Sequence, residues 1–160
     1  GWFSRLYMKR KNKEFPELLM DEKLVSHYYW LDNNNIIVYG RSSGVLTYFK
    51  INIERGTISP FHQNSLDIFG DGHPSVSADG KFLITDSYPD RSRNRHLLFL
   101  NLANSKIIDV GEFFEPLKFD GVSRIDLHPR ISPDSQCVSI DAGYEGVRRN
   151  YIIDISELVQ

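Results

Sequence analysis

Apolar residues along the chain come in short runs that are separated by turns rich in Asp, Asn, Gly and Ser. No run shows the three-and-four-residue spacing of an amphipathic helix, and the lengths and flanking turn residues are those of β-strands. The pattern predicts strands at 2–10, 15–20, 36–39, 45–53, 58–61, 82–85, 97–102, 107–110, 138–140 and 151–155. We therefore expect an all-β protein.

One segment of the chain is repeated. Gly72–Asp86 contains a histidine, a short strand, a turn and an apolar strand, and it recurs without a gap at His128–Asp141. A looser copy covers Ser26–Tyr39. With His27, His73 and His128 in register, the copies are 46 and 55 residues apart. Self-similarity at such a spacing predicts a repeat architecture.

Each repeat holds four short strands, which is typical of one blade of a β-propeller. We expect a single domain over 1–160, with full blades at 24–61 and 71–110 and partial blades at 1–20 and 126–156. A closed propeller needs at least about four blades. The chain is therefore expected to be part of a longer polypeptide that supplies the missing blades, or to complete its ring by self-association.

The turns of the repeat carry a family resemblance. The segments Ser77-Ala78-Asp79-Gly80-Lys81 and Ser132-Pro133-Asp134-Ser135 resemble the repeat of TolB-like propellers, Pro-x-Trp-Ser-Pro-Asp-Gly-Lys followed by an apolar strand. The resemblance covers nearly the whole chain and implies a partial β-propeller from a bacterial cytoplasm or periplasm. It implies little about activity, because one fold hosts many functions.

The amino-acid composition bears on which classes of partner the protein is expected to bind. The chain has a formal net charge of −2, with 41% hydrophobic and 25% charged residues. This balance gives no sign of binding to nucleic acid or to an acidic membrane surface. No apolar run is long enough to span a bilayer. We expect a soluble protein with neither nucleic-acid nor membrane partners.

The candidate chemistry lies at the repeated histidines. In a propeller the first strand of each blade lines the channel, so His27, His73 and His128 should lie near the channel mouth, with loops 86–95 and 141–149 around them. Three converging imidazoles suit a divalent metal ion. The alternative is structural, with each histidine capping its inner strand through a backbone carbonyl. The sequence leaves both open.

A narrower resemblance concerns those histidines. A histidine at this position of the repeat, followed by Ser and an Asp-Gly type of turn, is similar to the pattern of oligogalacturonate lyases. The resemblance implies a divalent metal, Mn or Zn, bound by His27, His73 and His128. It further implies an acidic oligosaccharide as ligand, with the metal on the uronate carboxylate and a base removing the adjacent proton. The glutamine ligand and the base of that family have no counterpart at matching positions.

Cationic and aromatic side chains in the loops are candidates for binding that saccharide. Arginine forks suit carboxylates and tyrosine rings suit sugar faces. The candidates are Tyr88, Arg91, Arg130, Tyr144 and Arg148. Asp71 and Asp126 each precede a histidine by two residues and are candidates for orienting an imidazole. The alternative for all of them is a solvated loop with surface ion pairs and ordinary turn residues.

Two functions therefore remain open from the sequence. The first is binding of an acidic saccharide at the channel mouth, with metal-dependent lyase-like chemistry as its extension. The second is a non-catalytic propeller scaffold that binds a protein or a glycan on the same face.

Overall fold

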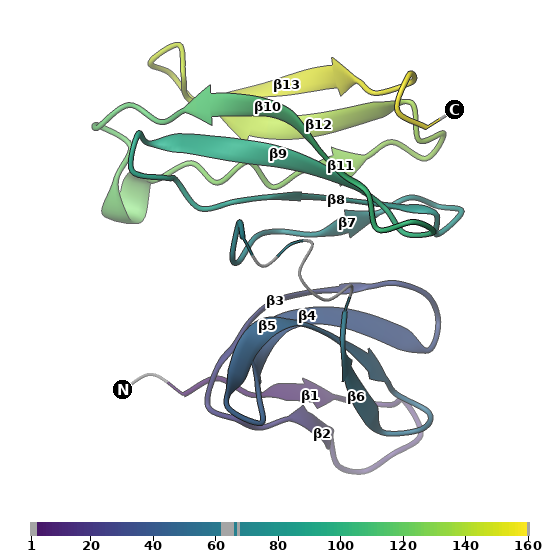
Figure 1. The fold of residues 1–160 in the computed structure, drawn as a ribbon. Coiled ribbons are helices and arrows are strands. Elements are labelled where there is room, and N and C mark those ends of the chain that lie inside the picture. The colour runs from purple at the N-terminus through teal and green to yellow at the C-terminus, as the bar shows by residue number, and fades with distance from the viewer. Residues whose placement is uncertain (1–2, 62–65, 67, 160) are drawn as a thin grey trace. The chain divides into compact units, whose positions relative to one another are not determined.

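A computed structural model describes residues 3–61, 66 and 68–159 of the chain (Figure 1). The chain divides into two compact units, Gly1–Gln63 and Asn64–Gln160. Within the described residues, strands and turns make up almost all of the structure, and the single helical element is the 3₁₀ turn η1, Gly121–Ser123. The predicted all-β class is confirmed, and no helix of the described residues is long and apolar enough to cross a membrane.

The first unit holds a two-stranded and a four-stranded antiparallel sheet. The two-stranded sheet pairs β1, Leu6–Met8, with β2, Glu17–Met20. The second sheet is the meander β3, Val25–Trp30, β4, Asn35–Ser42, β5, Val45–Asn52, and β6, Thr57–Pro60. The strand predicted at 2–10 is shorter, because the described residues pair only over β1; Trp2 lies outside them.

The second unit holds the next two copies of the repeat. Its four-stranded sheet is the meander β7, Ser75–Val76, β8, Phe82–Asp86, β9, Asn94–Asn101, and β10, Ile107–Phe114. Its three-stranded sheet is β11, Arg130–Ile131, β12, Cys137–Ala142, and β13, Arg149–Asp154. Every pairing is antiparallel between sequence neighbours, which is the order within propeller blades.

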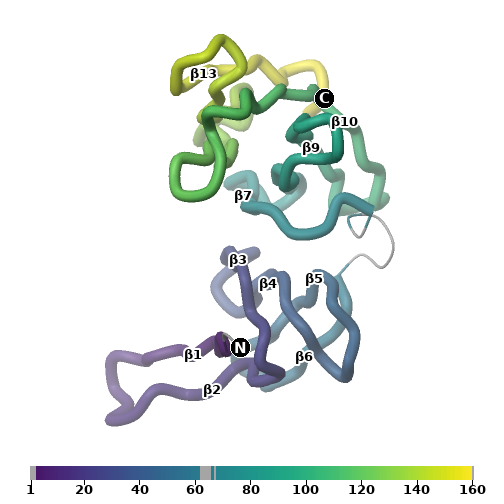
Figure 2. The backbone as a smooth tube through the Cα atoms, turned by 90° about the vertical axis from the view of Figure 1, so that its left-hand side faces the viewer, coloured from purple at the N-terminus to yellow at the C-terminus, as the bar shows by residue number. Residues whose placement is uncertain are grey.

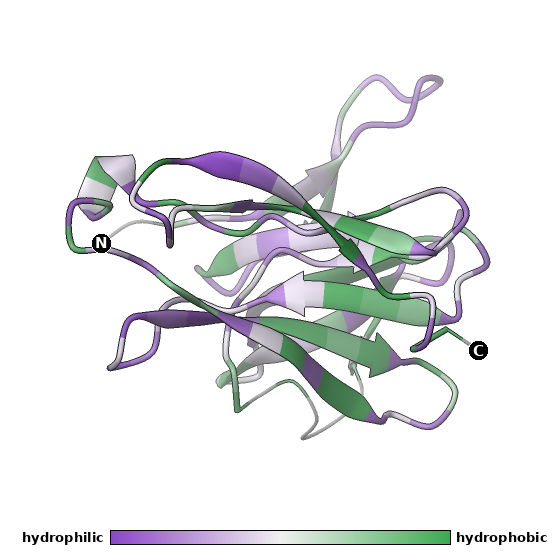
Figure 3. Cartoon of the chain, turned by 90° about the horizontal axis from the view of Figure 1, so that it is seen from above, coloured by the Kyte–Doolittle hydropathy of each residue, from purple (hydrophilic) through white to green (hydrophobic). Residues whose placement is uncertain are grey.

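The core of the second unit lies between its two sheets. Alternate side chains of β8, β9 and β12 meet there, as expected for strands with one face buried. The buried cluster comprises Phe82, Ile84, Leu97, Phe99, Leu127, Val138, Ile140, Ala142 and Ile155. Figure 3 shows hydrophobic residues along the strands and hydrophilic residues at most turns. A separate cluster of Leu6, Met20, Val38, Phe49 and Ile51 stabilises the first unit.

The turns explain why the repeat has its sequence. In β7–β8 the Ser77 hydroxyl donates to Asp79 Oδ1 at 2.8 Å, and that oxygen also accepts from the Lys81 backbone N–H at 3.1 Å. In β11–β12 the Ser132 hydroxyl donates to Asp134 in the same way. The two turns are therefore built by the same side-chain bonds, which the Ser-x-Asp pattern encodes locally.

These sheets give the architecture predicted from the sequence, a partial β-propeller of antiparallel blades. A short strand follows His73 and His128 by two residues in both later copies, whereas His27 lies inside β3. The grouping of all blades in a single domain stays a prediction.

Candidate functional site

A fully buried carboxylate, Asp86, organises the site of the second unit. It stands at the end of β8, and its side chain is 0% exposed. Its Oδ1 accepts from the His73 backbone N–H at 2.7 Å and lies 2.9 Å from His73 Nδ1. Its Oδ2 accepts from the His128 backbone N–H at 3.0 Å. One side chain thus holds two copies of the repeat together.

Glycine is required beside this carboxylate. A Cβ atom added at Gly72 would lie 1.9 Å from the Asp86 carbonyl oxygen and 2.7 Å from Thr85 Oγ1. The backbone before His73 therefore approaches the end of β8 more closely than any residue with a side chain allows.

The two imidazoles lie against each other. The ring centroids of His73 and His128 are 4.0 Å apart, with planes inclined by 45°. His128 Nδ1 is 3.2 Å from the Asp126 carbonyl oxygen, and a carbonyl only accepts, so Nδ1 carries the proton. His73 Nδ1 likewise faces an acceptor, the Asp86 carboxylate. Burial lowers the pKa of His128, and the neighbouring His73 lowers it further, so the neutral ring is favoured.

The Asp126 carboxylate is the third group beside the rings. Its Oδ2 accepts from Arg124 Nε at 3.0 Å, and its Oδ1 lies 2.9 Å from Arg95 Nη1. That second contact lacks hydrogen-bond geometry, and Oδ1 is a buried acceptor without a hydrogen bond among the described residues. Burial tends to raise the pKa of Asp126, but the Arg124 bond and the Arg95 charge outweigh it, so the pKa is lowered.

The Asp126 carboxylate is paired with a buried network of charged side chains. Arg95 is 2% exposed and Glu115 is 4% exposed, and Arg95 Nη2 donates to both Glu115 oxygens at 3.2 Å. Glu115 Oε1 also accepts from the Ile125 backbone N–H at 2.9 Å. Arg93 Nε donates to the Glu115 carbonyl oxygen at 2.8 Å. Paired in this way, buried charges fix the segment that carries Asp126 and His128.

Tyr88 borders the histidines on the loop after β8. Its ring centroid is 6.4 Å from that of His73, and its hydroxyl accepts from Arg124 Nη2 at 3.3 Å. The Arg124 guanidinium carbon lies 5.0 Å from the ring centroid, a cation–π contact. Burial raises the pKa of the Tyr88 hydroxyl, so it stays protonated at neutral pH.

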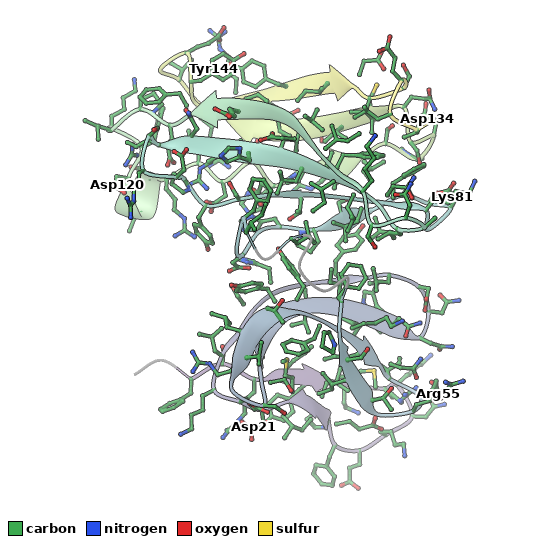
Figure 4. The ribbon with its side chains drawn as sticks, in the orientation of Figure 1. Asp21, Arg55, Lys81, Asp120, Asp134 and Tyr144 are labelled. Carbon is green, nitrogen blue, oxygen red and sulfur yellow. The ribbon has the colours of Figure 1, made fainter. Side chains whose placement is uncertain are left out.

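The expected loops do share an end of the second unit. Figure 1 shows the connection from β8 to β9 and the connection from β12 to β13 at the same end. In Figure 4, Tyr144 marks the second of these loops, whereas Lys81 and Asp134 mark the turns at the opposite end. Tyr144 stacks on Tyr151 with centroids 5.0 Å apart, and Arg148 Nη2 bonds Asp141 at 2.8 Å.

Three other predicted residues are not part of the ligand group that the described residues His73, Asp126 and His128 form. Arg91 is exposed on its loop. Arg130 is exposed and lines a pocket of about 170 Å³ with Ser139 and Ile152. His27 lies in the first unit, with its Nδ1 3.1 Å from Ser26 Oγ. The binding roles of these residues, and of Tyr144 and Arg148, stay predictions.

Several residues of the site were not among the predicted ones. The carboxylate that lies on His73 Nδ1 is Asp86, while the Asp126 carboxylate pairs with Arg95 and Arg124 and the Asp126 carbonyl oxygen lies on His128 Nδ1. A signal for Asp86 exists, because an aspartate follows the histidine at the same spacing in both later copies, at Asp86 and Asp141. Arg95, Glu115 and Arg124 carry no repeat signal.

The donor set fits a divalent metal ion. His73, Asp126 and His128 each offer one ligand atom, and these atoms lie within 4.8 Å of one another. Both Nδ1 atoms face oxygens, so each Nε2 is the nitrogen left to bind a metal ion, an arrangement common in histidine metal sites. Imidazole and carboxylate ligands suit Zn²⁺ or Mn²⁺.

Comparison with solved structures places the fold. Oligogalacturonate lyase in complex with manganese aligns at TM-score 0.67 and 14% identity, over 91% of this chain and 40% of that one. TolB from Acinetobacter baumannii aligns at 0.63 and 17%, over 91% and 33%. A putative TolB from Agrobacterium tumefaciens aligns at 0.64 and 15%, over 96% and 54%. No protein-family model and no curated protein matches the sequence.

These similarities confirm the predicted resemblance at the level of the fold. The chain has the fold of TolB-like and oligogalacturonate lyase-like β-propellers. It spans between 33% and 54% of the length of the three structures named above.

Proposed function

We propose that the end of the second unit around His73 and His128 binds an acidic saccharide through a divalent metal ion. The observation that carries the proposal is the set of His73, Asp126 and His128, whose ligand atoms lie within 4.8 Å of one another. The buried Asp126 Oδ1, which has no hydrogen bond among the described residues, supports it. Two imidazoles held by Nδ1 and one carboxylate would bind Mn²⁺ or Zn²⁺.

Each residue has a separate task in this proposal. Asp86 holds the His73 ring through Nδ1 and fixes the His128 backbone. Arg124 lies over Tyr88, and both flank the metal ligands, so the guanidinium would pair with a sugar carboxylate and the ring would contact a sugar face. When bound, a metal ion supplies Lewis-acid polarisation of that carboxylate.

The proposal is for binding rather than turnover. A lyase needs a base beside the carbon that loses its proton. The His128 ring favours its neutral form, yet both histidines serve here as metal ligands. The similarity to the manganese-bound oligogalacturonate lyase, at 14% identity, supports the saccharide class as a hypothesis and leaves lyase activity as its extension.

Calorimetric titration of the chain with Mn²⁺ and Zn²⁺ tests the metal. His73→Gln and His128→Gln should each weaken binding at this site by roughly tenfold or more, since each removes one ligand. Unchanged binding in both variants would favour the structural role, with the histidines only capping strands.

Uronate oligosaccharides test the ligand. We expect saturable binding with metal present and its loss when a chelator removes the metal. New ultraviolet absorbance from an unsaturated uronate would establish lyase activity. If acidic saccharides neither bind nor react while the metal still binds, the scaffold function remains, with a protein partner on the same face.

A further inference from the structure

A second cluster of metal-ligating side chains lies on β9 and β10. His96 comes from β9, and Asp109 and Glu112 come from β10. Figure 2 shows these two strands running side by side at the edge of their sheet. Each residue offers one ligand atom, and the three atoms lie within 4.8 Å of one another. None of the three belongs to the group around His73 and His128.

A β-bulge brings the two carboxylates to the same face as the imidazole. Glu112 lies opposite His96, and Asp109 lies opposite Leu98, which is two residues after His96 on the same strand face. In a regular strand Asp109 and Glu112, three positions apart, would point to opposite faces. The register shift between Asp109 and Gly111 removes that alternation.

The imidazole has a carboxylate beside each of its two nitrogens. Asp109 Oδ2 is 2.7 Å from His96 Nδ1, and Asp90 Oδ2 is 3.9 Å from His96 Nε2. Asp90 is anchored because its Oδ1 accepts from the backbone N–H groups of Ser92 and Asn94, each at 2.8 Å. The Phe69 ring lies 5.4 Å from the imidazole, measured between centroids, and limits its movement.

The charge of the cluster is not balanced by cations. No lysine or arginine within residues 3–61, 66 and 68–159 forms an ion pair with Asp90, Asp109 or Glu112, and among those residues the only basic side chain within 4.0 Å of the Asp90 and Asp109 carboxylates is His96. Three carboxylates around one imidazole leave a site of excess negative charge, which a divalent cation would neutralise.

We propose that His96, Asp109 and Glu112 bind one divalent transition-metal ion of the zinc or manganese class. Nδ1 of His96 and one oxygen of each carboxylate are the ligands, and Nε2–H points toward Asp90, which orients the ring. The ion takes the place of the hydrogen bond between His96 Nδ1 and Asp109 Oδ2. It joins β10 to β9 where the bulge interrupts their ladder, so its role is to fasten the edge strand.

The site on β9 and β10 is tested in a chain whose other candidate metal site, around His73 and His128, has been removed. In a His73→Gln/His128→Gln chain, titration with zinc should give one equivalent of bound metal. Adding His96→Gln should weaken that binding by roughly tenfold or more, and Asp109→Asn and Glu112→Gln should act in the same direction. Glu157→Gln, a carboxylate outside the cluster, is the matched control and should change nothing.

Thermal melting separates ligand loss from misfolding. Zinc should raise the melting temperature of the His73→Gln/His128→Gln chain by a few degrees and leave unchanged that of the same chain with His96→Gln added, while the two chains melt alike without metal. If the double background does not fold, His96→Gln in the unaltered chain must lower the bound zinc by one equivalent. No zinc binding in the double background, or binding that ignores His96→Gln, would overturn the proposal.

Discussion

The two copies of the repeat in the second unit form the same side-chain hydrogen bonds at one end of the unit and different ones at the other. At the turn end, both copies make the same bonds, with Ser77 and Ser132 donating to Asp79 and Asp134. Each serine oxygen also accepts the backbone N–H five residues on, from Phe82 and Cys137, at 3.0 Å in both copies. The turns are interchangeable because every partner lies within the turn itself.

At the histidine end the copies diverge. Asp86 binds His73 of its own copy and the backbone of His128 of the next. The matching Asp141 instead accepts from Arg148 at 2.8 Å, and its Oδ1 lies 3.4 Å from Asn150 Nδ2. Equal letters in a repeat therefore indicate equal structure at the turns and unequal roles at the site, where partners come from other parts of the chain.

The largest expected effect concerns Asp86. Asp86→Ala leaves two backbone N–H groups and an imidazole without their buried acceptor, and should lower the free energy of unfolding of the second unit by about 2–4 kcal/mol. Asp141→Ala is the matched change in the next copy and should cost less than about 1 kcal/mol, because its ion pair is exposed. Urea denaturation of both variants checks the difference. Equal losses would remove the contrast between the copies.

At the turns we expect two smaller changes in stability that have opposite signs. Gly80 and Ser135 occupy the same turn position with φ of 71° and 62°, a region that disfavours side chains. Gly80→Ala should destabilise by about 1 kcal/mol, whereas Ser135→Gly should stabilise by a few tenths of a kcal/mol after the greater freedom of the unfolded chain is subtracted. Both values come from thermal unfolding, and two changes of the same sign would show that the turns are not equivalent.

The smallest effect is in the titration of the two turn aspartates. The hydrogen bond from Ser77 lowers the pKa of Asp79, and the bond from Ser132 lowers that of Asp134. A lowered folded pKa means that the stabilisation is present above about pH 4, the unfolded value, and is lost as the pH falls through the folded value.

Nuclear magnetic resonance titration of the carboxyl carbons measures both aspartates in one experiment. Ser77→Ala should raise the pKa of Asp79 and leave Asp134 unchanged, and Ser132→Ala should do the reverse. A joint shift in either variant would show that the turns are coupled.

Local patterns made the fold predictable. Strands, turns and their repetition depend on residues that are close in sequence, such as Ser77 and Asp79. The register of the copies also placed His73 and His128 at equivalent positions, and their ring centroids lie 4.0 Å apart, while the convergence of all three histidines on one metal ion stays a prediction. The strand predicted at 107–110 extends to Phe114, because alternation breaks at the bulge and the sequence gives no sign that pairing continues.

The rest of the site depends on long-range packing. Asp86 and the His128 backbone are 42 residues apart, and no periodicity connects them. From the sequence, Arg95 is an ordinary polar residue at the start of a strand. In the structure it is buried because Glu115 and Asp126, which come from distant parts of the chain, pair with its guanidinium. Likewise Asp109 and Glu112 read as residues of opposite faces until the bulge is known.

Gly72 has a consequence for the history of the chain. Duplicated segments can overwrite each other during recombination, and Leu127 occupies the position that matches Gly72 in the later copy. Copying the later segment backwards would place a leucine where even a Cβ meets the Asp86 carbonyl oxygen at 1.9 Å. Copying forwards would delete Leu127, which is 1% exposed, from the core. Each direction of exchange thus loses either the close approach at Gly72 or the buried Leu127, so the two histidine segments cannot replace each other without cost.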